Sequence, residues 1–178
     1  MPLRLILVRH AKSAWGDASL DDFDRPLAPR GRRAAVWIGE VLRAEAWLPE
    51  RVICSTAERT RQTLDLAGFS GSAVSYDRQV YDLMSKDYVE LIRAHGKGQV
   101  FMLVGHNMAT TDTATALLAN DMGIADFTTG AIAVIDFDVA DWAAVEEGTG
   151  QLVAFRKPPK GYGARKGRPN VIRACSGG

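Results

Sequence analysis

Two of the three histidines in the chain, His10 and His106, each come just after a short apolar segment, whereas His95 does not. Arg9 precedes His10, and Arg59 lies about one helical turn after a third apolar segment. A neutral imidazole is a competent nucleophile, and guanidinium groups can bind a phosphoryl group bidentately while neutralising its charge. The residue types therefore indicate phosphoryl transfer, a reaction that needs no metal when a histidine is the nucleophile.

Alternating apolar segments and helical patterns must position these side chains. Short aliphatic runs predict strands at residues 3–8, 51–54, 73–76 and 99–104. Helical periodicity follows at residues 29–46, 56–67, 86–94 and 108–119. Such alternation predicts an α/β fold with three layers, a mainly parallel sheet between helices, and an antiparallel edge from residues 131–137 and 151–155. Ligands bind at the carboxyl ends of such strands, so the two histidines and two arginines should converge there.

Ser55 and Glu58 have the spacing of a capping box, in which each side chain satisfies a free backbone N–H of a helix start. This spacing predicts a helix that begins at Thr56 and ends near Ala67. The second strand and its helix would then meet at Ser55.

Length and composition favour one soluble domain. The chain has 178 residues and 47% apolar content, and no apolar run is long enough for a membrane span or a signal peptide. Cys54 and Cys175 lie far apart, which gives no support for a disulfide framework and suits a reducing compartment. We expect a cytoplasmic protein.

Charge divides the chain into an acidic body and a basic end. From Arg156 onward there are seven Lys or Arg residues and no acid, although the net charge of the whole chain is +1. We therefore expect one domain at residues 1–156 and a basic, Pro/Gly-rich tail at residues 157–178. The tail is either a solvated end or an arm that attracts an acidic or phosphorylated partner. We do not expect nucleic-acid binding, because Tyr162 is its only aromatic residue.

Several motifs resemble those of the histidine phosphatase superfamily. Residues 7–13, Leu-Val-Arg-His-Ala-Lys-Ser, resemble its R-H-G/A signature. Arg25-Pro26-Leu27 with Gly31, residues 54–63, and residues 104–107 (Val-Gly-His-Asn) resemble its later motifs, in the same order. The resemblance covers about residues 3–155 and is most similar to the small SixA-like phosphohistidine phosphatases. It implies a phosphoglycerate mutase-like fold.

The resemblance also implies roles for four residues. His10 would carry the phosphoryl group as a covalent phosphohistidine that water later opens. Arg9 and Arg59 would bind phosphate, and His106 would complete the pocket, protonated or sharing a proton with the phosphate while His10 is neutral. The substrate would be a phosphohistidine protein or a small phosphate ester. No cofactor is expected, and the residues offer no metal-ligand spacing.

The leaving group raises the question of a general acid. Family members that act on alkyl phosphates usually supply a carboxyl group after the third strand or directly after the second histidine. Asn107 occupies the latter position, and Asp82 is the nearest match to the former, with a turn cap as an equal alternative. Without an acid, a phosphohistidine substrate is favoured, because its imidazole leaves easily. Ser13 is a further candidate phosphate contact, or a loop cap.

Three other interpretations compete with a histidine phosphatase. Cys54 suggests a cysteine phosphatase, a class with about five residues between its cysteine and its arginine. Four residues separate Cys54 from Arg59 and six separate it from Arg61, so neither arginine has that spacing. A noncatalytic phosphate-binding module would not require the nucleophile His10. A mutase would need an insertion that encloses its substrate, and no large insertion is evident.

Overall fold

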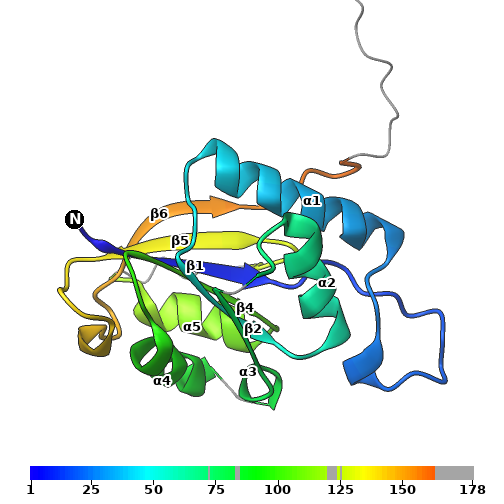
Figure 1. Ribbon diagram of the computed structural model, residues 1–178, viewed down its shortest axis with the longest axis horizontal. Coiled ribbons are helices and arrows are strands. Elements are labelled where there is room, and N and C mark those ends of the chain that lie inside the picture. The colour runs from blue at the N-terminus through cyan, green and yellow to red at the C-terminus, as the bar shows by residue number, and fades with distance from the viewer. Residues whose placement is uncertain (72, 83–84, 120–123, 125, 163–178) are drawn as a thin grey trace, which may run out of the picture.

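A six-stranded sheet runs through the middle of the molecule in the computed structural model, with helices on both faces (Figure 1). The structure describes residues 1–71, 73–82, 85–119, 124 and 126–162. The strands are β1 (Leu3–Arg9), β2 (Arg51–Ser55), β3 (Val74–Asp77), β4 (Val100–Gly105), β5 (Ile132–Phe137) and β6 (Gln151–Arg156). The helices are α1 (Pro29–Ala44), α2 (Glu58–Ala67), α3 (Gln79–Asp82), α4 (Ser85–His95) and α5 (Ala109–Leu117), with short 3₁₀ turns η1 (Asp22–Asp24) and η2 (Trp142–Ala144).

The sheet has the strand order β3-β2-β4-β1-β5-β6. β1, β2, β3 and β4 are parallel to one another, whereas β5 pairs antiparallel with β1 and with β6. The predicted parallel sheet with an antiparallel edge is therefore confirmed. β4 lies between β1 and β2, which brings the carboxyl ends of these three strands together at one edge of the sheet.

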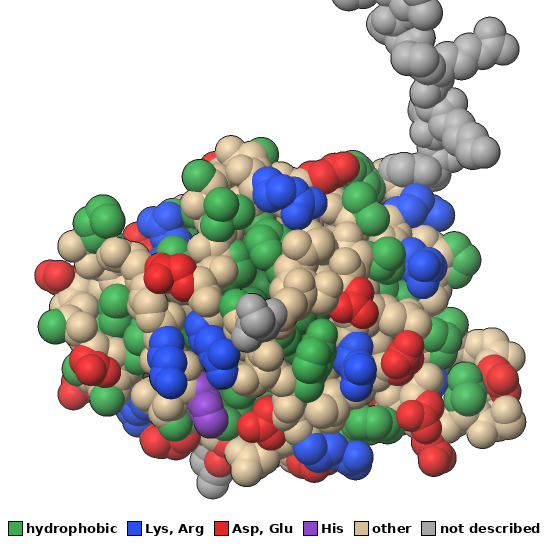
Figure 2. Space-filling model, in the orientation of Figure 1, with side chains coloured by type: hydrophobic (Ala, Val, Ile, Leu, Met, Phe, Trp, Pro, Cys, Tyr) green, Lys and Arg blue, Asp and Glu red, His purple; other side chains and the backbone are tan. Residues whose placement is uncertain are grey.

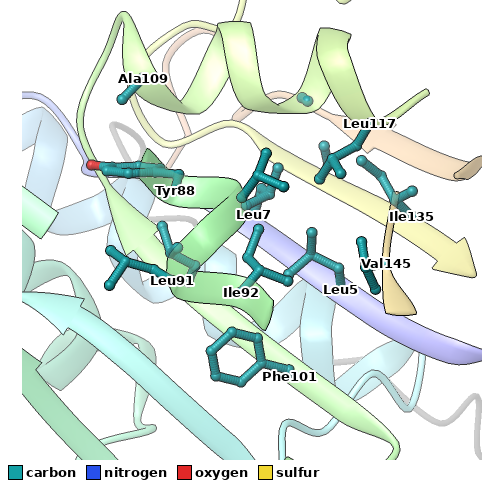
Figure 3. Packing of buried hydrophobic residues seen from close by; sticks show 14 of the residues in the cluster. Leu5, Leu7, Tyr88, Leu91, Ile92, Phe101, Ala109, Leu117, Ile135 and Val145 are labelled. Atoms are coloured by element: carbon teal, nitrogen blue, oxygen red, sulfur yellow. The ribbon is translucent and has the colours of Figure 1, made fainter. Parts of the chain in front are cut away.

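Side chains of β1 alternate between two hydrophobic layers, as the period of a strand requires. Ile6 and Val8 pack with residues of α1 and α2, while Leu5 and Leu7 pack with residues of α4 and α5. Figure 3 shows the second layer, where Tyr88 and neighbouring aliphatic side chains gather beneath the sheet. The α/β/α arrangement with three layers is thus confirmed, and burial on both faces holds β1 rigidly in place.

The predicted capping box is wrong. α2 begins at Glu58 and has no side-chain cap, so the helix starts later than Thr56. Ser55 is the last residue of β2, and its Oγ accepts a hydrogen bond from the Ala57 backbone N–H at 3.2 Å. Glu58 Oε1 instead accepts from the side chain of Gln62, at 2.7 Å. The spacing matched, but the strand continues through Ser55 and turns this side chain toward the sheet edge.

The start of the expected tail packs on the domain. Arg33 Nε in α1 donates to the Tyr162 carbonyl oxygen at 3.0 Å, and the Tyr162 ring packs against the hydrophobic layer beneath α1. Figure 1 shows this segment, in orange, passing beside α1. Residues 157–162 therefore differ from a solvated end, and residues 163–178, with Cys175, lie outside the described residues. Among the residues described, no helix has the length and apolar character needed to cross a membrane.

Candidate active site

His10 and His106 face each other where β1 and β4 end. The His10 backbone N–H donates to the Gly105 carbonyl oxygen at 3.0 Å, and the two imidazole ring centroids are 5.2 Å apart. Only 8% of each residue is exposed. Adjacent parallel strands thus bring together two residues that are distant in the sequence, as predicted from their positions at strand ends.

The hydrogen bond of His10 defines its tautomer. His10 Nδ1 lies 2.7 Å from the carbonyl oxygen of Ala11, which can only accept, so Nδ1 carries the proton. Burial lowers the pKa of His10 to about 3, and the charges of Arg59 and Arg9 add to this effect against the hydrogen bond to Ala11. His10 is therefore neutral at pH 7, with a lone pair on Nε2.

His106 is held from two sides. Its Nε2 lies 2.8 Å from Ser55 Oγ, and its backbone N–H donates to Tyr88 Oη at 3.3 Å. Tyr88 Oη in turn donates to the Val80 carbonyl oxygen at 2.6 Å. A Cβ at Gly105 would stand only 2.6 Å from Tyr88 Oη, so glycine at that position permits the close approach. The histidine is thereby fixed by groups from β2 and α4.

His106 is also neutral in this structure. Burial lowers its pKa to about 2, and the interaction with the His10 imidazole and the charges of Arg59 and Arg9 lower it further, against Asp22. An imidazolium at rest, one of the two expected states, is therefore disfavoured by its surroundings. His106 Nδ1 is buried without a hydrogen-bond partner in the described part of the chain.

Arg9 is partly fixed by the segment before β5. Its Nη1 donates to the Phe127 carbonyl oxygen at 2.7 Å, while its Nε is buried without a hydrogen-bond partner among the residues described. Burial lowers the pKa of Arg9 from its usual value, but a guanidinium remains charged. Arg9 thus supplies a fixed positive charge beside His10.

Arg59 is paired with a carboxylate that the sequence analysis missed. Arg59 Nη2 lies 2.9 Å from Asp22 Oδ2, to which Tyr81 Oη donates at 3.0 Å, and Arg25 Nη1 contacts the other oxygen at 2.9 Å. The Tyr81 ring meets His106 edge to face at 5.3 Å. Partial burial raises the pKa of Asp22, but Arg59, Tyr81 and Arg25 together hold it below its usual value. Asp22 is therefore an anion beside both histidines.

Asp22 was not predicted because it lies in the loop before α1, not at a strand end. Its only signal in the sequence is its place three residues before Arg25-Pro26-Leu27. Tyr81 stands next to the predicted Asp82, and it is Tyr81 that faces the site. The search at strand ends could not find either side chain.

Asp82 points to a different partner. Its carboxylate is about half exposed and lies 3.3 Å from Arg78 Nε on the same helix turn. Successive residues of a helix are rotated by about 100°, so Tyr81 and Asp82 of α3 face different ways. Within the described ranges, Asp82 forms its hydrogen bonds and ion pair with Arg78 and none with His10 or His106.

The other predicted positions have identifiable partners. Ser13 is buried, and its Oγ accepts from Arg25 Nη2 at 3.4 Å. Asn107 is exposed, and its side chain accepts from Thr111. Cys54 is fully buried and burial raises the pKa of its thiol, which makes it a poor nucleophile. In the ranges described, no three His, Cys, Asp or Glu side chains gather so as to hold a metal ion.

Comparisons with known proteins show the family of the chain. The profile of the histidine phosphatase superfamily (branch 1) matches residues 5–84. An uncharacterised protein of Mycobacterium tuberculosis, Rv1276c, is 38% identical over 160 residues, which cover 85% of this chain and 99% of the relative. The chain belongs to the histidine phosphatase superfamily, whose members are phosphatases.

Solved structures place the chain within that superfamily. A candidate phosphohistidine phosphatase SixA from Agrobacterium tumefaciens is 31% identical, with a TM-score of 0.76 over 89% of this chain and 100% of the other. A second candidate SixA, from Nakamurella multipartitia, is 29% identical with the same TM-score, over 89% and 97% of the two chains. The chain is SixA-like, and its phosphoglycerate mutase-like fold is confirmed.

Proposed function

We propose that this protein is a metal-independent phosphohistidine phosphatase that forms a covalent phosphohistidine on His10 Nε2. The observation that carries the proposal is the hydrogen bond from His10 Nδ1 to the Ala11 carbonyl oxygen. It leaves the lone pair on Nε2, and burial keeps the ring neutral. Arg9 and Arg59 supply the positive charge that a transferring phosphoryl group requires.

The reaction proceeds in two displacements at phosphorus. The Nε2 lone pair of His10 forms a bond to phosphorus, and the bond to the leaving imidazole breaks, with the electron pair going to that imidazole. If its other nitrogen carries a proton, the imidazole leaves neutral and needs no acid. Water then attacks phosphorus and both of its protons stay with the phosphate, which leaves as H2PO4⁻. The bond from phosphorus to Nε2 breaks with its electron pair going to His10, which is again a neutral imidazole because Ala11 holds the proton on Nδ1.

Ser55 and His106 supply a donor to the phosphoryl group. Ser55 Oγ already accepts from the Ala57 N–H, so its hydroxyl hydrogen is free to donate to His106 Nε2. A neutral His106 then carries its proton on Nδ1, the buried nitrogen that has no other described partner. His106 thus donates to a phosphate oxygen without first becoming an imidazolium.

The electrostatics of the site favour phosphohistidine over alkyl phosphates. Asp22 is the carboxylate whose charge acts on both histidines, and its lowered pKa makes it a poor proton donor. Asp82 remains a candidate general acid, although Arg78 holds its carboxylate in this structure. A leaving imidazole does not need the proton that an alkoxide demands. The buried free thiol of Cys54 also suits the reducing cytoplasm, where we place this activity.

Labelling tests the covalent step. Incubation with phosphorus-32 phosphoramidate should give an acid-labile label, which mass spectrometry assigns to His10. His10→Asn should abolish the label, whereas His95→Asn, which changes an exposed histidine at the end of α4, should keep it. Retention of label by His10→Asn would contradict the proposal, and stoichiometric phosphate binding without label would favour a noncatalytic phosphate-binding module.

Relative rates test the substrate class. The value of kcat/KM should be larger for a phosphohistidine protein than for each member of a panel of small phosphomonoesters, with His10→Asn as the blank. A preference for one of the small esters would instead identify a small-molecule phosphomonoesterase.

A further inference from the structure

A basic cavity of about 690 Å³ lies beside α1 and outside the pair of histidines. Its wall carries five cationic side chains, Lys12, Arg30, Arg33, Lys157 and Lys160. The segment after β6, which passes beside α1 in Figure 1, supplies the lining residues of one side. We call it the basic cavity below. A volume of this order is typical of a site for a small molecule.

The charges of the basic cavity are poorly balanced. Asp126 is the one carboxylate in the described lining, and Lys157 Nζ already pairs with it at 2.9 Å. The first turn of α1, which carries Arg30, contains no acidic residue. Like charges that surround one cavity repel each other, and an anion within it would relieve the repulsion.

The basic cavity shares a wall with the site at His10. Thr128 and Thr129 line the cavity, and the next residue, Gly130, donates its N–H toward the carbonyl oxygens of Arg9 and His10, both at 3.1 Å. Lys12 lies two residues after His10, which places their Cα atoms no more than about 7 Å apart. A ligand in the cavity would therefore lie next to the phosphoryl site, on separate side chains.

We propose that the basic cavity binds an oligophosphate, a chain of two or three phosphate groups. Guanidinium forks such as those of Arg30 and Arg33 match phosphate oxygens bidentately. With the lysines, the lining carries more positive charge than a ligand with a single carboxylate would balance. The volume also exceeds what a single phosphate fills. The inference concerns this cavity alone and does not require turnover at His10.

Calorimetry with inorganic tripolyphosphate on the full chain tests the site. Arg30→Gln combined with Lys160→Gln should weaken binding about tenfold, the effect of losing two modest ionic contacts. Both side chains are exposed and make no hydrogen bond or ion pair with other described residues, so the melting temperature should not fall. The matched control is Arg32→Gln with Lys97→Gln, which removes the same charge outside the cavity and should leave affinity within about twofold of the original protein.

The variant Arg59→Ala separates this site from the site at His10. Tripolyphosphate should still bind Arg59→Ala, because Arg59 does not line the basic cavity. Loss of binding in this variant, or equal weakening by the cavity pair and its control, would overturn the proposal. So would binding of an oligoglutamate peptide as tight as that of tripolyphosphate, which would identify an acidic protein segment as the occupant.

Discussion

The site at His10 and the basic cavity are neighbours, and both carry positive charge. They differ in how firmly their cationic side chains are held. In the first, Arg9 and Arg59 are held by hydrogen bonds to the Phe127 carbonyl oxygen and to Asp22. In the second, Arg30 and Lys160 are exposed and have no such partner among the residues described. Fixed donors stabilise developing charge without reorganisation, whereas flexible ones bind anions less specifically. The difference supports the proposed chemistry in the first region and the proposed binding in the second.

Arg59→Ala should have the largest effect of the tests of this contrast. Loss of one fixed charge contact in a transferring phosphoryl group costs roughly 3–4 kcal/mol, so kcat for phosphohistidine should fall by about two to three orders of magnitude. Arg30→Gln should leave kcat within about twofold, because Arg30 is exposed in the cavity wall. Steady-state kinetics of both variants measure this difference in kcat. Similar losses of kcat in the two variants would contradict a distinction between the two regions.

The buried histidines should make the stability of the fold sensitive to acid, whereas the arginines of the basic cavity should not. His10 and His106 have folded pKa values of about 3 and 2, below the unfolded value near 6.5. As pH falls below about 6.5, the unfolded chain takes up protons that the folded protein does not, so stability falls by up to about 1.4 kcal/mol per pH unit for each histidine.

His106→Gln tests this pH dependence. Denaturant unfolding at pH 7, 6, 5 and 4 should show a slope that is smaller by about 1.4 kcal/mol per pH unit than that of the original protein. Arg30→Gln should keep the original slope, since an arginine does not titrate in this range. Parallel stability curves for His106→Gln and the original protein would contradict neutral burial of His106.

Tyr88→Phe tests whether the histidine pair depends on its support. The change removes the hydroxyl that accepts from the His106 backbone N–H and donates to the Val80 carbonyl oxygen. Leaving such buried groups unpaired should lower the free energy of unfolding by about 1–3 kcal/mol, with a fall in kcat. Tyr76→Phe is the control, because that tyrosine is exposed on β3. Equal effects in both variants would rule out a specific role for Tyr88.

Asp22→Asn should have the smallest effect, and it should strengthen phosphate binding where the other variants lose activity or stability. Asp22 occupies Arg59 Nη2, the same group that would bind a phosphate oxygen. Removing this negative charge should tighten competitive inhibition by inorganic phosphate about fivefold, the size of one modest ionic contact. Asp17→Asn in the same loop, whose carboxylate bonds to Ser19, should not change the inhibition constant. Weaker inhibition by phosphate in Asp22→Asn would show that Asp22 orders Arg59 instead of competing for it.

Comparison of the predicted and observed site shows which signals are readable in a sequence. His10 and His106 were found because each follows an apolar strand and because parallel strands end at one edge of a sheet. Asp22 and Tyr81 were missed because a loop and a short helix bring them in, and neither has a periodic signal. The capping box failed because Ser55 bonds across the sheet edge to His106, a partner 51 residues away.

The sequence by itself determined the order of the main strands and helices, the two layers around β1 and the choice of His10 as the proposed nucleophile, since these follow from local periodicity and short motifs. Only the tertiary structure decided the tautomer of His10, the neutrality of His106, the pairing of Asp22 with Arg59, and the basic cavity. Those properties depend on burial and on distances between segments that no local pattern encodes. Lys12 and Lys157, for example, meet in one cavity wall only because the chain after β6 folds back onto α1.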